Sequence, residues 1–405
     1  MSKLKKLIEE LCPKGVKNKK LKEVCDFVNG FAFRSSLFRE GGEKIIRITN
    51  INGCTIDIDD VKYFHKEDYK TDLEQFSIKN GDILIAMSGA TTGKIGYYNY
   101  DDISYLNQRV GKFKPYNGIL YNRYLYHILL ANTETLYVLA GGGAQPNLSS
   151  NRLMDAFEFP VPPIAVQKEI AHILDDFTNQ TAELQAELQA RKEQYEYYRN
   201  KLLTFDKSGK NTKSVTWMKM GDIGNICMCK RIMKEQTNSI SGVPFYKIGT
   251  FGKVADAYIS RELYEDYKKR FSFPVKGEVL ISASGTIGRA VIYDGKDAYF
   301  QDSNIVWIHN DETKVLNRYL YYYYQIVEWN VEGGTIKRLY NNNLANTKIA
   351  VPSLSEQERI VFILDKFETL VNDLSHGLPA EISAVQEQYV YYRNTLFSFQ
   401  KITEE

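Results

Sequence analysis

Residues 88–94 read Ser-Gly-Ala-Thr-Thr-Gly-Lys, and a glycine-bracketed loop that ends in Gly-Lys could cradle a phosphate. A P-loop, however, has four residues between its glycines and a hydroxyl residue after its lysine, which reaches magnesium. Here three residues separate Gly89 from Gly93, and Ile95 follows Lys94. The mostly apolar run at 81–87 indicates a buried strand that enters a tight turn. The stretch therefore favours a strand–turn–strand hairpin over a nucleotide-binding site.

A second copy of this turn, Ser-Gly-Thr-Ile-Gly-Arg-Ala, occupies residues 284–290. It keeps the glycines but exchanges Gly93-Lys94 for Gly288-Arg289. A nucleotide site would need its lysine in both copies, whereas contact with the phosphates of a polyanion needs only a cation. We therefore expect a glycine turn at the end of a core strand, presenting one basic side chain in each copy.

No set of residues predicts catalysis or metal binding. The chain has no nucleophile elbow, no GxGxxG after a strand, no HExxH or CxxC, and no Asn-Pro-Pro-aromatic motif for amino-methyl transfer. Asp175 and Asp365 recur beside Ile-Leu pairs on predicted helices, and surface charge is the simpler interpretation. An odd number of cysteines argues for reduced thiols in a cytoplasm; they are Cys12, Cys25, Cys54, Cys227 and Cys229.

Length and composition indicate a multidomain globular protein. A chain of 405 residues exceeds one ordinary core and predicts at least two domains. Its hydrophobic fraction of 43% and charged fraction of 25% are typical of a soluble protein. No apolar run approaches the roughly 20 residues that cross a membrane, and charges interrupt the start of the chain where a signal peptide is apolar. We expect a cytoplasmic protein without a membrane partner.

The sequence contains an internal repeat, with two similar copies offset by about 195 residues. The stretch EQYEYYRNKLL at 193–203 returns as EQYVYYRNTLF at 387–397, with eight of eleven positions identical. An NRYLY segment begins at both 122 and 317. A period of this length is too long for a solenoid repeat and predicts a duplicated domain pair.

Each repeat combines short strands with a long helical part, which predicts an α+β fold class. From Ile170 the apolar positions advance by alternating steps of four and three, a heptad seam interrupted by Thr181 and Arg191. A helix of about 40 residues would be about 60 Å long. The expected parts are a first globular domain at 1–156 with a short helix at about 2–12, a helical segment at 157–206, a second globular domain at 207–347 and a helical segment at 348–405.

The seam predicts pairing between the helical segments. The second copy has four extra residues, and Gly377 with Pro379 should break its helix into a shorter one ending near His376 and a longer one from about Pro379. The tyrosines on the seam are interpreted as helix contacts. The predicted pairing residues are Ile170, Leu174, Phe177, Leu184, Leu188, Tyr195, Tyr198, Leu202, Ile360, Leu364, Phe367, Tyr389, Tyr392 and Leu396.

Charge divides along the same boundaries. The globular parts carry net charges of +4 and +6, whereas each helical segment carries −4. Basic domains suit a polyanion such as DNA, and acidic helices suit pairing and protein partners. The tyrosine-rich stretch at 319–324 could stack bases, but core packing is favoured because its partner at 124–129 is a packing helix.

Candidate nucleic-acid contacts are basic, amide or hydroxyl residues beside predicted strands, turns and glycine-rich loops of the basic domains. An exposed loop that leads into a helix explains the stretch at 337–343 almost equally well, and any single one of the other cations is more simply explained without a nucleic-acid contact. The candidates are Arg34, Arg47, Thr91, Lys94, Arg109, Gln145, Asn147, Lys247, Arg289, Lys337, Arg338 and Asn341.

These features together resemble the DNA-specificity subunits of type I restriction–modification systems. The resemblance rests on two Pro-(Pro/Ser)-x-x-x-Gln-x-x-Ile-x-x-Ile-Leu-Asp helix openings at 162–175 and 352–365, the two EQYxYYRN helices, the NRYLY segments and the strand-to-Ser-Gly turns. The opening LKKLIEELCPKGV also resembles the start of such subunits. Together these motifs cover nearly the whole chain.

The resemblance implies a non-catalytic, sequence-specific DNA-binding subunit. Each basic domain would be a target-recognition domain that reads one half of a split double-stranded DNA sequence. Two long antiparallel helical segments, in a circular pseudo-twofold arrangement, would fix the spacing of the half-sites and bind two methyltransferase subunits. S-adenosylmethionine, ATP and Mg would be held by partner methyltransferase and restriction subunits, and no cofactor by this chain. Because the two domains differ between their shared landmarks, an asymmetric target is expected.

Two other hypotheses stay open from the sequence. One is a P-loop-like nucleotide-binding enzyme built on residues 88–94. The other is a coiled-coil scaffold with no role in nucleic-acid binding.

Overall fold

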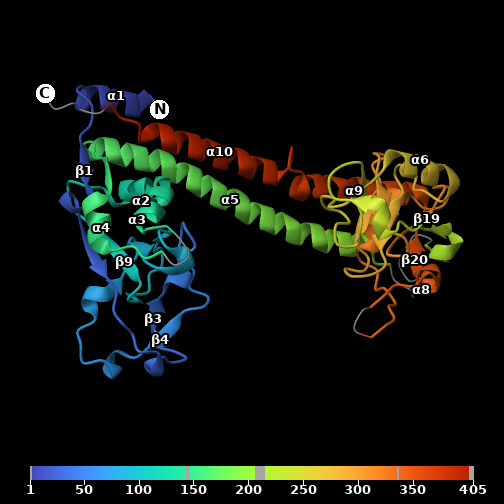
Figure 1. Cartoon of the computed structure of the whole chain (residues 1–405), viewed down its shortest axis with the longest axis horizontal. Coiled ribbons are helices and arrows are strands. Elements are labelled where there is room, and N and C mark those ends of the chain that lie inside the picture. Colours follow the sequence, from blue (N-terminus) through green and yellow to red (C-terminus); the bar gives the residue numbers. More distant parts are fainter. Residues whose placement is uncertain (1, 143–145, 206–214, 335–336, 401–405) are drawn as a thin grey trace. The chain divides into compact units, whose positions relative to one another are not determined.

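The computed structural model describes residues 2–142, 146–205, 215–334 and 337–400, and the chain divides into two compact units (Figure 1). Unit 1 comprises Met1–Leu184 with Ile382–Glu405, and unit 2 comprises Gln185–Glu381. The C-terminal end of the chain therefore belongs to the same unit as its N-terminus. Among the described residues, no helix combines the length and apolar character needed to cross a bilayer.

Unit 1 is built on two four-stranded sheets and a short two-stranded ribbon. The ribbon pairs β1 (Asn18–Lys20) with β10 (Glu158–Pro160). The first sheet is antiparallel, in the order β2 (Cys25–Asn29), β9 (Val110–Pro115), β6 (Ile83–Ala86), β7 (Ile95–Tyr97). The second has the order β4 (Lys62–Phe64), β3 (Glu43–Ile46), β8 (Ser104–Leu106), β5 (Ser77–Ile78), with β3 and β8 parallel. Strands β3 and β4 lie on the side of the unit away from its long helices (Figure 1).

The central strand β6 explains why the run at 83–86 is apolar at every position. Alternate residues of a strand point to opposite faces. Ile83 and Ile85 pack in the cluster that contains the helices, whereas Leu84 and Ala86 pack in a second cluster with residues of β3 and β8. Both faces of β6 are therefore buried.

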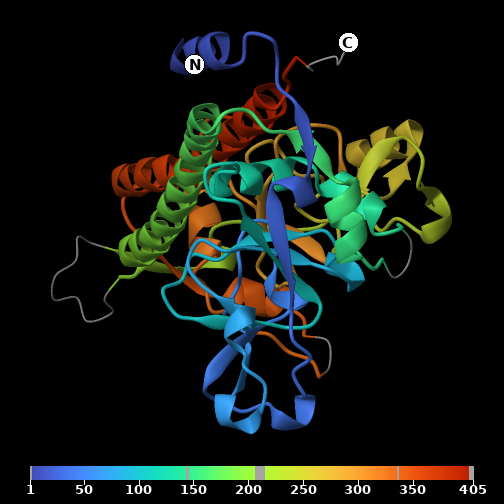
Figure 2. The same ribbon diagram turned by 90° about the vertical axis from the view of Figure 1, so that its left-hand side faces the viewer.

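Helices cover the first of these clusters. They are α1 (Ser2–Leu11), α2 (Asn122–Ala131), α3 (Thr133–Leu139), α4 (Ser150–Ala156), the first half of α5 (Ile164–Leu203) and the second half of α10 (Leu378–Leu396). The backbone N–H of Val16 donates to the carbonyl of Gln400 over 2.9 Å, and α1 lies beside the last turn of α10 (Figure 1 and Figure 2). These contacts close the first and last parts of the chain into one core.

Unit 2 repeats this plan. Its antiparallel sheet runs β12 (Asn225–Cys227), β19 (Ile305–His309), β16 (Val279–Ser282), β17 (Ala290–Ile292). Its second sheet runs β13 (Thr237–Asn238), β15 (Tyr258–Ile259), β14 (Val243–Tyr246), β18 (Tyr299–Phe300), and its ribbon pairs β11 (Thr216–Lys219) with β20 (Lys348–Val351). The helices are α6 (Arg261–Arg270), α7 (Asn317–Tyr324), α8 (Asn341–Asn346), α9 (Leu354–Asn372) and the second half of α5. The predicted duplicated α+β fold is confirmed.

The repeats differ mainly at the edges of their second sheets. Strand β5 adds to β8 in unit 1, whereas β13 adds to β15 on the opposite edge in unit 2. Helix α6 follows β15, while the chain after β4 in unit 1 forms only short 3-10 turns in the described residues. The core of the domain is therefore duplicated and its periphery has diverged.

One buried glutamine in each unit fastens the long helix to the NRYLY helix. In unit 1 the Oε1 of Gln167 accepts from the backbone N–H of Tyr121 over 2.7 Å, and its Nε2 donates to the carbonyls of Ile119 and Pro162. In unit 2, Gln357 makes the same three bonds, which involve Leu316, Lys314 and Pro352. Both glutamines have no exposed surface. The Pro-x-x-x-x-Gln spacing is therefore a structural clamp.

The same joint corrects the interpretation of Asp175 and Asp365 as surface charges. Asp175 on α5 accepts from the Nε of Arg123 over 3.0 Å and is 2.7 Å from the Nε2 of His127, both on α2. Asp365 on α9 accepts from Arg318 and from the hydroxyl of Tyr322, both on α7. The surface interpretation was wrong because each carboxylate faces the arginine of an NRYLY segment, a partner far away in sequence.

Most of the predicted seam residues lie in two buried clusters. Ile170, Leu174 and Leu396 are buried in the core of unit 1, whereas Ile360, Leu364 and Tyr195 are buried in the core of unit 2. Stacked ring pairs join Phe177 to Tyr392 at 5.3 Å and Tyr198 to Phe367 at 5.7 Å. Three more are partly buried against these cores, namely Tyr389, Leu188 and Leu202. Leu184 is half-buried and lies outside both cores.

The predicted helix break is confirmed, with shifted ends. Helix α9 ends at Asn372, four residues before His376, and α10 begins at Leu378, so each helix has 19 residues. The expected difference in their lengths was wrong. The Asp373 carboxylate accepts from the backbone N–H of Ser375 over 2.7 Å and of His376 over 3.2 Å. This local Asp turn competes with helix continuation and ends α9 early.

Replacing Gln167 by leucine tests the clamp. The substitution leaves three backbone groups buried without hydrogen-bond partners, so we expect a loss of about 3 kcal/mol in the free energy of unfolding of unit 1. Thermal and urea unfolding followed by circular dichroism measure the change. Gln189→Leu, exposed on the same helix, is the control and should change stability by no more than about 0.5 kcal/mol. Equal effects of the two substitutions would contradict the clamp.

His127 predicts an acid-sensitive joint. Burial lowers the pKa of His127 below its ordinary value of 6.5, although the adjacent Asp175 opposes this effect. Below pH 6.5 the unfolded chain therefore binds more protons than the folded chain does. The stability of unit 1 should then fall as the pH falls from 6.5 toward 5. His127→Gln, which keeps a donor for Asp175, should flatten this part of the melting-temperature profile. An unchanged slope in the variant would contradict the assignment.

Candidate nucleic-acid interface

The two Ser-Gly turns are hairpins. In unit 1 the turn at Gly89–Thr91 joins β6 to β7, which pair antiparallel, and the N–H of Gly93 donates to the carbonyl of Ala86 over 2.9 Å. In unit 2 the N–H of Gly288 donates to the carbonyl of Ser282 over 2.9 Å between β16 and β17. The predicted strand–turn–strand hairpin is confirmed, and neither turn leads into a helix as a P-loop does.

The second glycine of each turn is required by conformation. Gly93 and Gly288 both have a φ of 82°, which other residues rarely adopt. A Cβ at Gly288 would also lie 2.3 Å from the Nε1 of Trp329, and one at Gly93 would lie 3.4 Å from the backbone nitrogen of Tyr137. The glycines that suggested a phosphate cradle therefore serve turn geometry and packing.

In unit 1, backbone contacts gather several candidate residues around this turn. The hydroxyl of Thr91 donates to the carbonyl of Ile48 over 3.2 Å, which places Arg47 beside the turn. The N–H of Met87 donates to the carbonyl of Arg109 over 2.8 Å, and Ser88 forms a β-bridge with Asn147. The candidates that the structure brings together here are Arg47, Thr91, Lys94, Arg109 and Asn147.

The cations of this group differ in their availability. Lys94 and Arg109 are exposed, and neither has an ion-pair partner among the described residues. Arg47 is half-buried, with its Nη2 3.7 Å from an Oδ2 of Asp60, while its Nε is buried without a hydrogen-bond partner in the described structure. Lys94 and Arg109 are therefore the cations of this turn that are best placed to meet a phosphate.

Unit 2 has an equivalent junction with different side chains. Ser284 forms a β-bridge with Arg338, and the N–H of Ala283 donates to the carbonyl of Asn304 over 2.7 Å, as that of Met87 does to Arg109. A Cβ at Gly285 would lie 3.5 Å from the side chain of Ile248, which follows Lys247, just as one at Gly89 would lie 3.4 Å from the side chain of Ile48. The structure thus brings Lys247, Arg289 and Arg338 to the second turn.

The equivalent cations of the two turns are not equally free. The guanidinium of Arg289 donates to the carbonyl of Phe251 over 2.9 Å, whereas Lys94 is exposed. Arg338 donates to the hydroxyl of Ser303 over 2.8 Å, and Lys247 pairs with Asp256 over 2.9 Å. Lys337 and Asn341 are exposed on either side of this segment. Unit 2 therefore presents Lys337 and Asn341 more openly than Arg289.

Some candidates lie apart from the turns. Arg34 is exposed, and its backbone N–H donates to the hydroxyl of Tyr69, so it lies near another aromatic cluster of unit 1. Gln145 lies outside the described residues. Sequence reasoning missed Asn304, whose Oδ1 accepts from the hydroxyl of Ser284 over 2.9 Å. The repeat offset of 195 pairs Asn304 with Arg109 and could have identified it.

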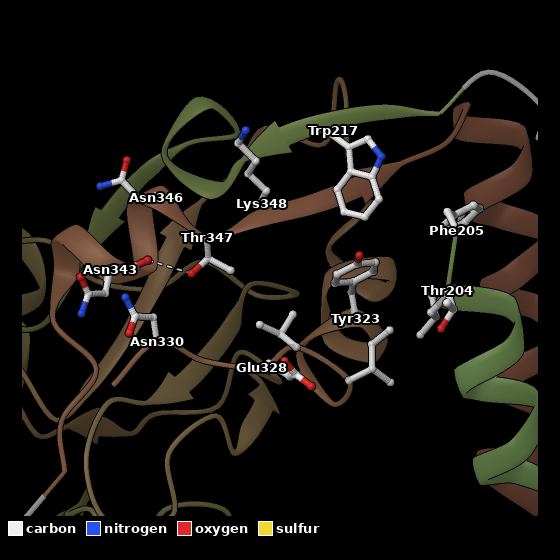
Figure 3. A pocket seen from close by; sticks show the side chains of 13 residues that line it. Thr204, Phe205, Trp217, Tyr323, Glu328, Asn330, Asn343, Asn346, Thr347 and Lys348 are labelled. Atoms are coloured by element: carbon white, nitrogen blue, oxygen red, sulfur yellow. Dashed lines mark hydrogen bonds between the residues drawn. The ribbon is translucent and has the colours of Figure 1, made fainter. Parts of the chain in front are cut away.

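Two hollows lie in the part of unit 2 that the structure describes. A cavity of about 340 Å³ borders Arg338 and Asn341 at the second turn. A larger one of about 550 Å³ lies among the ends of α5, α7 and α8, where Trp217 and Tyr323 face amide side chains (Figure 3). There the hydroxyl of Thr347 donates to the carbonyl of Asn343, and so it is not paired with a general base. The described residues also include no group of three or more His, Cys, Asp or Glu that could hold a metal ion.

Comparison with known proteins shows which family the chain matches. Residues 13–194 and 213–384 match the family model of the type I restriction modification DNA specificity domain. The chain is 46% identical, over 84% of its own length and 88% of the relative's, to a putative type I restriction enzyme specificity subunit of Haemophilus influenzae. It is 35% identical over 60% of its length, and 61% of the relative's, to the specificity subunit of the Escherichia coli enzyme EcoR124I/EcoR124II.

Solved structures show the same fold. The S subunit of a type I restriction–modification system from M. genitalium superposes with a TM-score of 0.54 at 16% identity, covering 94% of this chain and 96% of that one. A chain from a study of complex assembly and conformational transition of the type I R-M system gives a TM-score of 0.58 at 18% identity, covering 96% of this chain and 98% of that one.

Removing the Lys94 ammonium should weaken DNA binding equally on every sequence, because a phosphate contact carries no base information. For Lys94→Ala we expect the slope of log K against log salt to become shallower by about 0.9. The melting temperature should not change, since Lys94 is exposed. Lys192→Ala, exposed on α5, is the control and should leave the affinity and slope unchanged. A loss confined to one sequence, or equal in both variants, would contradict a phosphate contact by Lys94.

Proposed function

The chain belongs to the DNA specificity subunits of type I restriction–modification systems and carries two target-recognition domains, and on this premise we propose that each unit reads one half of a split DNA target. The observation that carries the proposal is the duplicated turn junction. The same backbone contacts hold Met87 and Ala283, whereas the surrounding side chains differ. Equivalent backbone contacts with different side chains suit two different half-sites.

The charge distribution supports DNA as the ligand of the globular parts. These parts carry net charges of +4 and +6, and cations lie at both turns. Phosphate contacts supply most of the affinity for DNA and depend on salt, whereas amide and guanidinium groups can read base edges. Arg109 and Asn147 in unit 1, with Lys337 and Asn341 in unit 2, are the exposed groups proposed for such contacts.

We assign the chemistry of modification and cleavage to partner subunits. Two methyltransferase subunits would bind S-adenosylmethionine and methylate adenine at N6, and restriction subunits would use ATP and Mg for translocation and cleavage. This chain would hold none of these cofactors and would act without catalysis of its own. The long helix α5, which is unbroken over 40 residues from unit 1 into unit 2, would fix the spacing between the half-sites.

Exchange of one recognition domain tests this proposal. Residues 207–347 are replaced by the corresponding domain of a relative with a different target, the chain is co-expressed with its methyltransferase subunits, and methylated adenines are mapped in the genome. We expect a split motif in which one half changes and the other half stays the same, because the units are separately folded cores.

An unchanged motif after the exchange, or a motif without two halves, would contradict the proposal. Charge reversals at Arg109, Arg289 and Lys337 provide a second test. If the assembled complex bound DNA as before, the chain would be a scaffold without a role in DNA contact.

A further inference from the structure

Unit 2 contains a further hollow, of about 430 Å³, that is lined by residues of both its four-stranded sheets. Four aromatic residues form its walls, namely Tyr246, Phe251, Tyr293 and Phe300, and the exposed Lys253 lies at its edge. Small-molecule sites in proteins are about 300–1,000 Å³ in volume and mostly apolar. This hollow is therefore large enough to hold one flat ring together with the groups attached to it.

The corresponding place in unit 1 has a longer loop beside it. The two loops begin alike, since the N–H of Arg47 and that of Lys247 each donate to the side chain three residues further on. The loop from β3 to β4 then has 15 residues, 47–61, whereas the loop from β14 to β15 has 11, 247–257. Ile56 and Val61 of the longer loop are buried among residues of β3 and β8. The longer loop therefore adds apolar side chains to the core of unit 1.

The contacts of Ile56 place it where unit 2 has the hollow. A Cβ at Gly96 would lie 2.2 Å from the Cδ1 of Ile56, and the hydroxyl of Tyr100 donates to the Ile56 carbonyl over 2.8 Å. Gly96 has the strand position that Val291, a lining residue of the hollow, has in unit 2. Residues 294–297 of unit 2 are Asp-Gly-Lys-Asp and have no ring to match Tyr100. The hollow is therefore a feature of the second repeat alone.

The walls of the hollow are aromatic rings that a packed core holds in place. The rings of Tyr246 and Phe300 stack with centroids 5.8 Å apart and planes at 17°, and Tyr293 meets Phe300 edge-on at 5.8 Å. Phe251, Tyr293 and Phe300 are buried, whereas Tyr246 is half-buried. Nucleobases stack on aromatic side chains because every base has a flat π-face. The hollow thus offers preformed surfaces for such a ring.

One wall of the hollow contacts the second Ser-Gly turn. The guanidinium of Arg289 donates to the carbonyl of Phe251 over 2.9 Å, and a Cβ at Gly252 would lie 3.6 Å from the Cδ of Arg289. Gly252 also lines the hollow. The hollow therefore lies next to the turn at which unit 2 is proposed to meet DNA.

The charges around the hollow favour a ring that carries a phosphate. Among the charged residues that line it, Lys253 alone has no ion-pair partner within the described part of the chain. The two carboxylates are already paired, Asp294 with Lys296 over 3.2 Å and Asp297 with Arg261. An unpaired ammonium beside aromatic walls suits a phosphate attached to a base.

We propose that the hollow receives one nucleobase of the bound DNA, which leaves the base stack and inserts beside Tyr246 while Lys253 contacts its phosphate. This inference rests on the proposed function and adds a base-binding site that unit 1 lacks. Leaving the stack costs free energy, which contacts with the rings offset. The cost is lowest for a base without a pairing partner, and so binding should respond to the removal of that partner.

Abasic substitutions in the target test the inference. The DNA affinity of the full chain with its methyltransferase subunits is measured on duplexes in which one nucleotide at a time is replaced by an abasic one. In the half-site that changes when residues 207–347 are exchanged, we expect a position at which the replacement tightens binding about tenfold, because the opposite base is unpaired. Tyr246→Leu should abolish this gain, and Lys253→Ala, at an exposed position, should reduce it at least threefold.

Two neighbouring residues provide matched controls. Tyr258→Leu removes a half-buried ring of the same sheet that does not line the hollow, and Lys269→Ala removes an exposed cation of α6. Both variants should keep the gain. An adenine that a methyltransferase subunit takes out of the stack should give a gain in every variant, because its pocket lies in the partner. Melting temperatures of the variants show whether unit 2 is still folded.

The absence of any gain that depends on Tyr246 and Lys253, in chains that remain folded, would overturn the inference. It would also be overturned if the isolated chain bound free deoxynucleoside monophosphates, and Tyr246→Leu abolished that binding without altering the response to abasic DNA. The hollow would then be a site for free nucleotides. A split methylation motif made by the unmodified complex would in either case leave the proposed function standing, whereas a complex without that motif would contradict the proposed function itself.

Discussion

The structure depends on the joint between each NRYLY helix and the long helix that follows it. A glutamine without exposed surface satisfies three backbone groups, and an aspartate eight residues later, about two helical turns on, faces the arginine of the NRYLY segment. An unpaired buried polar group costs about 1–3 kcal/mol. Replacing one residue of the joint without its partner should therefore destabilise the unit. The helix-opening motif that identifies the family in the sequence is therefore the contact that joins the core of each unit to its helices.

This joint also fixes where recognition residues can lie. Helix α2 packs against the face of β6 that carries Ile83 and Ile85, and the Ser-Gly turn follows directly at the end of that strand. The turn therefore follows a strand that is buried on both faces, while the side chains around the turn differ between the repeats. The edges of the second sheets, where β5 and β13 occupy opposite positions, are the other place where the repeats diverge. A frame shared by the two repeats, with turns whose side chains differ between them, suits a protein whose copies read different sequences.

The sequence was sufficient for the features that depend on local pattern. The duplication, the hairpin at 83–97 and the helix break before Leu378 all follow from periodicity, glycines and spacing. It failed where a distant partner decides the outcome. Asp175 looked like a surface charge because Arg123 and His127 are about 50 residues away, and Arg289 looked equivalent to Lys94 because the carbonyl of Phe251 is not visible in a motif. Which cations are free depends on contacts in the folded structure between residues that are distant in the sequence.

The central claim is that two homologous units on one chain read two different half-sites. Mapping methylated adenines in a genome that expresses the intact chain with its methyltransferase subunits tests it most directly. The account predicts a single bipartite motif with two unlike halves separated by a constant number of unspecified bases. A continuous motif, two identical halves, or a spacer of variable length would contradict it.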